Sequence, residues 1–268
     1  MNVLAIDIGG THVKILATGQ KEERKFDSGH KMTPAKMAEG VIRLAKDWNY
    51  DVVSIGYPGM VCHNQPVMEP YNLAKGWIGF NYRAAFRRPV KIVNDAAMQA
   101  LGSYKGGRML FLGLGTGLGS AMIVDGLLEP MELGHLPYKK ATYEDYVGLR
   151  GLEKYGKKKW RKLVKDVVER LQAALEPDDT VLGGGNVNNL KKLPPGCRAG
   201  NNANAFIGGF RLWTTGRTAP ELSFSKDPDA IRVKPNGPGP RRSTRKNSVN
   251  KAWPANPVRA AAQGETRR

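Results

Sequence analysis

Two apolar segments, each interrupted by a glycine-threonine turn, dominate the pattern along this chain. Residues 110–126 consist of an apolar run, a turn containing Gly115-Thr116, and a second apolar run. A shift of 105 residues places 4–16 over 109–121 and superposes Gly10-Thr11 on that turn. Short apolar runs on both sides of a glycine turn predict β-hairpins. The sequence therefore predicts two similar halves, each of which starts with a hairpin.

The rest of the chain, up to about residue 213, alternates between helical and strand patterns. Apolar residues at helical spacing predict helices over 34–48 and 157–175, and the second carries Leu163, Val164, Val167, Val168 and Leu171 on one face. Short β-branched runs predict strands at 52–56 and 89–93. A strand, helix and strand in this order predict a right-handed parallel crossover. The other predicted segments are a polar loop or edge segment at 19–31, a polar loop at 63–72, a helix at 96–102, a strand entering a glycine turn at 181–186 and a closing helix at 201–213.

Length and composition favour a globular α/β protein of one or two domains. The chain has 268 residues, of which 41% are hydrophobic and 25% are charged. No apolar run approaches the roughly 20 residues of a membrane span, and no signal-type segment precedes the first strand, so we expect no membrane association and a cytoplasmic location. Cys62 and Cys197 are far apart and lie near no paired histidines, which favours two reduced thiols.

The net charge of +18 favours anionic partners, among which are phosphates, polyphosphate and nucleic acid. Part of it lies in residues 214–268, which carry 12 Lys or Arg and four Asp or Glu and are rich in proline. This segment has no sustained helix or strand period, so we expect a disordered or peripheral basic tail. We favour a solvated tail over a nucleic-acid arm and expect no sequence-specific nucleic-acid binding.

Glycine-threonine turns of this kind suit phosphate binding. Glycine lets a ligand approach bare backbone N–H groups, a Thr hydroxyl adds a donor, and several N–H groups in one concavity attract an anion. Two ordinary hairpins, with glycines that only make turns, are the alternative. A dinucleotide fingerprint fits less well, because Gly115 and Gly117 precede a strand pattern, and no P-loop motif G-x-x-x-x-G-K-[ST] occurs.

A second candidate for chemistry is the pair Asn94-Asp95, which lies where a predicted strand gives way to a predicted helix. An Asp at this position can simply cap the helix. In open α/β sheets, however, residues at the carboxyl ends of strands line the ligand crevice. The Asp95 carboxylate therefore has two interpretations, a helix cap or a group that faces the same crevice as the second hairpin.

Five motifs in this order resemble the ROK sugar kinases, and among them the polyphosphate/ATP glucokinases. They are DIGGTHVK at 7–14, VND at 93–95, LGTGLGSA at 114–121, ELGH at 132–135 and LGGGN at 182–186. The resemblance covers about residues 2–213 and implies a two-domain α/β fold of the sugar kinase, heat-shock ATPase and actin type (ribonuclease H-like), with a cleft between domains. We expect an N-terminal domain at 1–95 and a C-terminal domain at 96–213.

The resemblance also implies a role for individual residues in transfer of a phosphoryl group to the 6-hydroxyl of glucose. Asp95 corresponds to the general base, and Asp7 to a residue that orients Mg²⁺ through water. Residues expected to hold the sugar are Asn94, Glu132, His135 and Glu144; those expected to face phosphates are Gly9, Gly10, Thr11, Lys14, Gly115, Thr116 and Gly117; Gly184 and Gly185 are expected near a nucleotide.

Several alternatives stay open at this point. In many ROK proteins, a histidine at the position of His135 is a metal ligand and is followed by a cysteine cluster. Residues 136–155 of this chain contain no Cys, so we expect His135 to contact the sugar and expect no structural zinc. The basic segment Lys157, Lys158, Lys159, Trp160, Arg161 and Lys162 is either a solvated helix face or a strip that docks polyphosphate. The acceptor is glucose, another hexose or an N-acetylated amino sugar. A non-catalytic sugar-sensing regulator is a further alternative, and dimers are common in the family.

Overall fold

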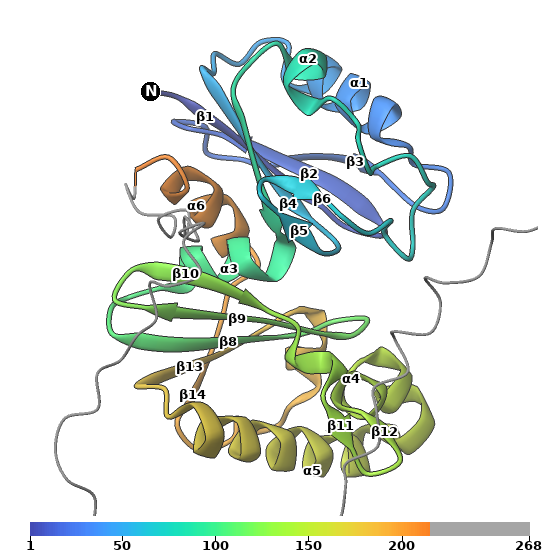
Figure 1. Cartoon of the computed structure of the whole chain (residues 1–268), viewed down its shortest axis with the longest axis vertical. Helices are drawn as coiled ribbons and strands as arrows, with labels where there is room; N and C mark the ends of the chain where they lie inside the picture. Colours follow the sequence, from blue (N-terminus) through green and yellow to red (C-terminus); the bar gives the residue numbers. More distant parts are fainter. Residues whose placement is uncertain (215–268) are drawn as a thin grey trace, which may run out of the picture. The chain divides into compact units, whose positions relative to one another are not determined.

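Two five-stranded sheets with the same topology organise residues 1–214, the part of the chain that this computed structural model describes (Figure 1). The first has the spatial order β3-β2-β1-β4-β7 and the second β10-β9-β8-β13-β14. In each, three antiparallel strands are followed by two parallel ones. The predicted repetition and the predicted parallel crossover are therefore confirmed. The strands are β1 (Val3–Ile8), β2 (His12–Ala17), β3 (Arg24–Asp27), β4 (Val52–Tyr57), β7 (Val90–Asn94), β8 (Arg108–Leu114), β9 (Leu118–Val124), β10 (Leu127–Met131), β13 (Asp179–Gly183) and β14 (Cys197–Ala199).

The two glycine-threonine hairpins, also confirmed, differ by one residue in register. Ile8 pairs with Val13 across β1 and β2, whereas Gly113 pairs with Gly119 across β8 and β9. The 105-residue shift therefore aligns β1 with β8 but needs one more residue to align β2 with β9. The last paired residues before the turn are Ile8 with Val13 in the first hairpin and Leu114 with Leu118 in the second, so the second turn is shorter by one residue.

Helices cover both sheets and fill the space between them. They are α1 (Pro34–Leu44), α2 (Tyr82–Phe86), α3 (Asp95–Ser103), α4 (Tyr143–Val147), α5 (Leu149–Leu175) and α6 (Asn204–Arg211), with 3₁₀ turns η1 (Leu133–His135) and η2 (Gly185–Asn189) and small hairpins β5 (Val61–Cys62) to β6 (Gln65–Pro66) and β11 (Pro137–Tyr138) to β12 (Ala141–Thr142). The segment 19–31 contains the edge strand β3, and α1 ends four residues before the predicted end. The α5 segment begins before the predicted Lys157 and is broken at Gly156, where φ is 69°.

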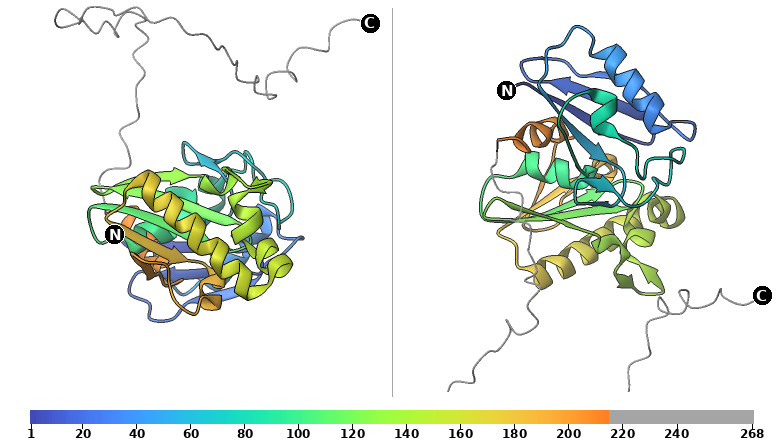
Figure 2. Two further views of the ribbon diagram at one scale, coloured as in Figure 1. Left: turned by 90° about the horizontal axis from the view of Figure 1, so that it is seen from below. Right: turned by 45° about the horizontal axis from the view of Figure 1, so that its top comes forward.

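The helices form layers with the sheets, as Figures 1 and 2 show: α1 and α2 lie on the outer side of the first sheet, α5 on the outer side of the second, and α3 and α6 between the sheets. Although α3 follows the first sheet in sequence, it packs on β8 and β9, and α6 returns to pack on β1 and β4. The two helices touch closely, because a Cβ at Gly208 would overlap the Met98 carbonyl oxygen. Division of the chain into domains at residue 95 stays a prediction.

The cores follow the predicted apolar faces. Leu163, Val164, Val167, Val168 and Leu171 of α5 are all buried against the second sheet, as predicted. Trp160 is also buried there, and its indole N–H donates to the Val147 carbonyl oxygen at 2.8 Å. Cys62 is exposed and Cys197 is partly buried, and neither is in a disulfide. No helix within residues 1–214 has the length and apolar character needed to cross a membrane. The predicted tail lies, after Thr214, outside the described residues.

Candidate active site

A cleft of about 540 Å³ is lined by both hairpin loops and by the start of α3. This volume is in the ordinary range for small-molecule sites. Most of the predicted site residues line the cleft: Gly9, Gly10, Asn94, Asp95, Gly115, Thr116, Gly117, Glu132, His135, Glu144 and Gly184. The predicted residues outside its lining are Asp7, Thr11, Lys14 and Gly185. The structure thus brings together residues from five separate sequence motifs.

The junction of β7 and α3 places Asn94 and Asp95 in the cleft. Asn94, not Asp95, is the N-cap of α3, since its side-chain oxygen accepts hydrogen bonds from the N–H groups of Ala96 at 2.9 Å and Ala97 at 3.3 Å. Its amide donates to the Gly59 carbonyl oxygen at 3.1 Å. Asp95 is the first helical residue, and its Oδ1 accepts from the Ala96 N–H at 2.7 Å. Because Asn94 performs the capping, the position of Asp95 is explained only in part by local structure.

Burial and like charges perturb the acidic groups of the site. Burial, reinforced by the negative charge of Asp7, raises the pKa of Asp95 to about 7. Burial also raises the pKa of Asp7 to about 6, although the nearby Lys14 ammonium acts in the opposite direction. The pKa of Glu132 is raised too, chiefly by burial. A carboxyl with a pKa near 7 is suited to accept a proton at neutral pH.

Two neighbouring carboxyl groups with raised pKa values also fit a divalent cation. Residues 1–214 contain no group of three or more His, Cys, Asp or Glu side chains arranged as a metal-binding cluster. Mg²⁺ does not need such a cluster, because it keeps several waters and is bound through one or two carboxylates together with substrate phosphates. Asp7 therefore fits Mg²⁺ only in a water-rich arrangement completed by a phosphate ligand.

Glu132, His135 and Glu144 form one wall of the cleft, and Ser120 positions it. The buried Ser120 hydroxyl donates to the Met131 carbonyl oxygen at 2.8 Å and accepts from the Leu133 N–H at 3.0 Å, which ties η1 to β9. His135 Nε2 lies 3.8 Å from Glu144 Oε1. These three polar side chains are available to hydrogen-bond a polyhydroxylated ligand.

The second hairpin loop lies against this wall and against the glycine turn after β13. A Cβ at Gly117 would overlap Glu144 Oε2, so the carboxylate rests directly on the glycine. The Gly115 carbonyl oxygen accepts from the Asn186 side-chain amide at 2.8 Å. Gly184 has a φ of 83°, and a Cβ there would overlap the Leu114 carbonyl oxygen. Glycine is thus required at Gly184, which meets backbone, whereas a side chain at Gly117 would displace the Glu144 carboxylate.

The sequence did not predict several further residues that line the cleft: Glu69, Asn72, Gln99, Asp145 and Arg150. Glu69 is held in place by accepting from the N–H groups of Gly76 at 3.0 Å and Trp77 at 3.1 Å. Their local patterns are those of an ordinary polar loop or helix. Only the nearness of Asp145 and Arg150 to the predicted Glu144 was a signal that could have indicated them.

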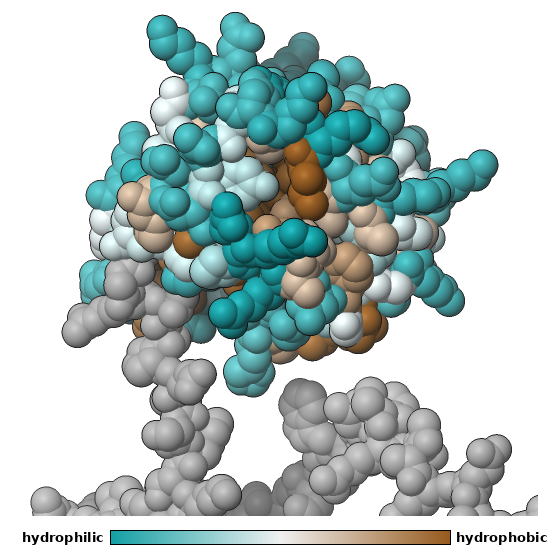
Figure 3. Space-filling view, turned by 90° about the horizontal axis from the view of Figure 1, so that it is seen from above, coloured by the Kyte–Doolittle hydropathy of each residue, from teal (hydrophilic) through white to brown (hydrophobic). Residues whose placement is uncertain are grey.

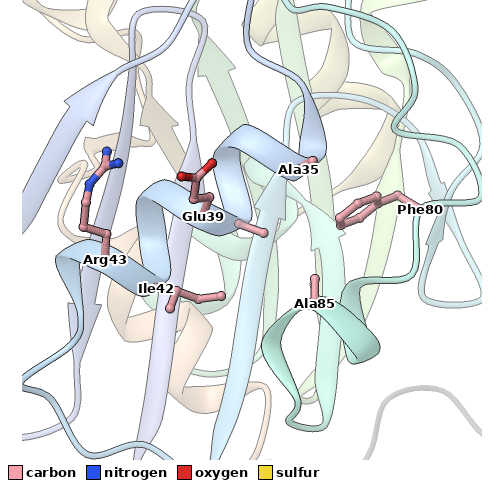
Figure 4. Close-up of a pocket in the computed structure, with 7 residues that line it drawn as sticks. Ala35, Glu39, Ile42, Arg43, Phe80 and Ala85 are labelled. Carbon is pink, nitrogen blue, oxygen red and sulfur yellow. The ribbon is translucent and has the colours of Figure 1, made fainter.

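Another hollow, of about 440 Å³, lies between α1 and α2 and contains none of the predicted site residues (Figure 4). Figure 4 shows Ala35, Ile42, Phe80 and Ala85 around it, with Glu39 and Arg43 on the same helix as Ile42. In the view from above, a small hydrophobic patch lies among hydrophilic residues (Figure 3). With a mainly apolar lining and no convergent polar groups, this hollow offers no catalytic chemistry.

The basic segment at 157–162 does not form one continuous strip. Lys157, Lys158, Lys159 and Lys162 are exposed, but Trp160 belongs to the core and Arg161 donates to the Asn189 carbonyl oxygen at 2.6 Å. Lys159 and Lys162 line a groove of about 560 Å³, whose other lining includes Tyr138, Lys139, Tyr143, Asp166 and Arg170. A ligand on this segment would therefore meet Lys159 and Lys162 in the groove without any contact to the tryptophan.

Comparison with known proteins places the chain in a family. The profile of the ROK family matches residues 3–151. A polyphosphate glucokinase of Mycobacterium tuberculosis (strain CDC 1551 / Oshkosh) is 31% identical over 212 residues, which cover 71% of this chain and 80% of that protein. Among solved structures, the inorganic polyphosphate/ATP-glucomannokinase from Arthrobacter sp. strain KM has a TM-score of 0.68 at 24% identity and covers 80% of this chain and 98% of its own.

A ROK family glucokinase from Streptomyces griseus, solved with glucose and AMPPNP, has a TM-score of 0.66 at 15% identity over 79% of this chain and 99% of its own. The structural matches confirm the two-domain fold of the sugar kinase and actin type that the sequence predicted. Together with the five motifs that meet in one cleft, these likenesses show that the chain belongs to the ROK family.

Proposed function

We propose that this protein transfers a phosphoryl group from ATP or polyphosphate to the 6-hydroxyl of glucose. The observation that carries the proposal is the position of Asp95, which lies in a cleft lined by both glycine hairpins and has a pKa raised to about 7. The relatives named polyphosphate glucokinase and the glucokinase solved with glucose and AMPPNP support the same donors and acceptor.

In the proposed mechanism, Asp95 accepts the proton of the attacking hydroxyl. A sugar hydroxyl is a poor nucleophile at neutral pH, and a carboxylate within hydrogen-bond reach accelerates such a step by roughly 10²–10⁴-fold. A pKa raised to about 7 by burial makes Asp95 a stronger base than an ordinary carboxylate, so it binds the transferred proton well. The hydroxyl oxygen then forms the new bond to phosphorus as the donor oxygen leaves.

The sugar is proposed to lie against Asn94, Glu132, His135 and Glu144. These groups offer both donors and acceptors, and they would be left unpaired by a ligand that lacks the matching hydroxyls, which is how a site rejects the wrong sugar. Asn94 is held by its cap hydrogen bonds and Glu132 follows directly on β10, so both are presented by ordered backbone. Because these side chains suit many sugars, another hexose or an N-acetylated amino sugar is the second candidate.

The donor is proposed to lie along the two hairpins. Gly9, Gly10, Gly115 and Gly117 would let its phosphates approach the backbone closely, and the hydroxyls of Thr11 and Thr116 and the charge of Lys14 would add to the binding. The N–H groups of Gly9 and Gly115 donate within the hairpins, to the carbonyl oxygens of His12 at 2.9 Å and Gly117 at 3.2 Å, so those of Gly10 and Gly117 are the proposed donors to phosphate. Lys14 lies 3.8 Å from Glu23 and outside the cleft lining, so it acts at longer range unless it moves. Gly184 and Gly185 would lie beside a nucleotide, and Asp7 would hold Mg²⁺ through water. The metal would neutralise charge on the phosphates when bound.

Polyphosphate is proposed to continue beyond the cleft onto the basic segment. Of its cations, Lys159 and Lys162 share a groove with Lys139 and Arg170, whereas Arg161 is engaged with backbone. Exposed Lys157 and Lys158 complete the proposed set. Binding of this kind is electrostatic and weakens with salt. A homodimer and a cytoplasmic location stay predictions.

The test is steady-state phosphorylation of glucose by the purified full-length protein with Mg²⁺, run in parallel with ATP and with polyphosphate, with Asp95→Asn as the control. We expect turnover with at least one donor and its loss in the variant. If neither donor supports turnover with glucose, other hexoses or amino sugars while glucose still binds, the protein is a non-catalytic sugar-binding member of the family. Turnover with ATP but not with polyphosphate would favour the interpretation of the basic segment as a solvated helix face.

A further inference from the structure

The charged groups that line the cleft are nearly all acidic. Within residues 1–214, Arg150 is the one lysine or arginine in the lining, whereas the carboxylates there are Glu69, Asp95, Glu132, Glu144 and Asp145. A polyphosphate or nucleotide donor adds several negative charges to the same space. Besides a bound Mg²⁺ and Lys14, which is outside the lining, only backbone N–H groups would offset this repulsion, so a cation in the lining has a specific use.

The backbone that carries Arg150 is fastened to the second hairpin. The N–H of the preceding residue, Leu149, donates to the carbonyl oxygens of Gly115 at 3.0 Å and Thr116 at 3.1 Å. Gly148 lies so close to the hairpin that an added Cβ would come within 2.5 Å of the Thr116 carbonyl oxygen. The position of Arg150 relative to the predicted phosphate loop is therefore fixed by backbone contacts.

The guanidinium group is held from one side only. Arg150 Nη1 donates to Asp145 Oδ1 at 3.0 Å, and Asp145 is itself fixed because its Oδ2 accepts from the Thr142 hydroxyl at 2.7 Å and the Thr142 N–H at 3.2 Å. The Arg150 side chain is 74% exposed. Since a guanidinium has five N–H donors, this arrangement leaves most of them for a ligand.

We propose that Arg150 binds the phosphate chain of the donor at the second hairpin and is a donor-binding residue common to ATP and polyphosphate. This inference rests on the proposed function. Arginine suits the role because its planar group pairs with phosphate oxygens through two parallel hydrogen bonds, which lysine does not reproduce. Asp145 aims the group without neutralising it fully, since the ion pair lies in contact with solvent.

The test compares Arg150→Gln with Lys154→Gln in the full-length protein. Lys154 is exposed, lies four residues further along the same helical segment, and is outside the cleft lining, so its variant loses the same charge at a matched place. We expect Arg150→Gln to raise the KM for both donors roughly tenfold to a hundredfold, as for other hydrogen bonds to charged groups, with the glucose KM changed less than about twofold. Arg150→Lys should recover only part of the loss.

Calorimetric binding of tripolyphosphate provides a second measurement that needs no turnover. We expect Arg150→Gln to weaken this binding by a similar factor and Lys154→Gln to leave it near the wild-type value. Equal behaviour of the two Gln variants in binding and in donor KM would overturn the role of Arg150, while turnover by the wild type would still uphold the proposed function. The reverse result, loss of binding in Arg150→Gln by a protein that phosphorylates no sugar, would overturn the proposed function alone.

Discussion

Substitution of Asp95 by asparagine should separate activity from stability. Asparagine keeps the shape of the side chain and an oxygen that can accept from the Ala96 N–H, but it cannot take a proton from a sugar hydroxyl. Loss of the general base should lower kcat by roughly 10²–10⁴-fold. The wild-type kcat/KM should rise with pH to a plateau above about pH 7, and a bound divalent cation that offsets the charge of Asp7 should move this rise to lower pH.

The same change should make the protein more stable at alkaline pH. The pKa of Asp95 is 3.8 in the unfolded chain and about 7 in the folded chain. The stability that the protonated carboxyl gives the folded chain is fully present below the unfolded pKa of 3.8 and is lost as the pH rises through the folded pKa of about 7. The asparagine side chain of the variant would have no charge to bury. At about 1.36 kcal/mol per pKa unit, the advantage of the variant should grow by about 2 kcal/mol between about pH 5.5 and about pH 8.

Urea unfolding of both proteins at these two pH values measures this difference. Asp125→Asn is the matched control, since Asp125 is exposed and lies in a turn with a φ of 50°, a conformation that asparagine tolerates well. A stability difference between wild type and Asp95→Asn that is the same at both pH values would refute the claim that burial of the charge raises the pKa. An activity loss below tenfold would refute the assignment of Asp95 as the base.

Three further changes test the packing, the sugar wall and the basic groove. Gly208→Ala should lower the free energy of unfolding, measured in urea, by about 1–3 kcal/mol, because the new methyl group would overlap a carbonyl oxygen of α3. Ile207→Ala, on an exposed part of α6, should change this free energy little. Ser120→Ala should raise the glucose KM by roughly tenfold and spare the donor KM, since it removes the partner of two part-buried backbone groups, the Met131 carbonyl oxygen and the Leu133 N–H, on either side of Glu132. An unchanged glucose KM would contradict this. The double variant Lys159→Ser with Lys162→Ser should raise the KM for long-chain polyphosphate but not for ATP, and the effect should depend on salt. The same effect from Lys157→Ser with Lys158→Ser would show that the groove has no special role.

The sequence predicted those parts of the fold that local patterns determine. Both hairpins, the strands at 52–56 and 89–93 and the buried face of α5 followed from apolar periodicity and turn residues. The internal repeat was visible because each half begins with the same glycine-threonine pattern. The one-residue difference in register was not visible, because a single residue in a loop leaves the apolar pattern of both strands unchanged.

Features that depend on contacts between distant segments could not be predicted from the sequence. The packing of α3 against α6 between the sheets depends on close backbone approach at Gly102 and Gly208, and neither glycine differs locally from any other helical glycine. Trp160 lies among lysines, for which the sequence allowed either a solvated helix face or a docking strip, yet its ring is buried in the core. Glu69 reaches the cleft through a loop that carries no periodicity, and Arg150 reaches it because the start of α5 lies against the second hairpin.

The position of Asp95 depends on glycines from both sheets. A Cβ at Gly56 of β4 would lie 3.6 Å from the Asp95 Cα and 2.5 Å from the Met98 Cε, and a Cβ at Gly119 of β9 would lie 2.8 Å from the Ala96 Cβ. The first turn of α3 is therefore gripped by one strand of each sheet. Since the hairpin loops of the same two sheets line the cleft, any shift of one sheet against the other must change the distance between Asp95 and at least one phosphate loop. The proposed base and the proposed donor site are thus connected through α3, because the helix that carries Asp95 packs on a strand of each sheet.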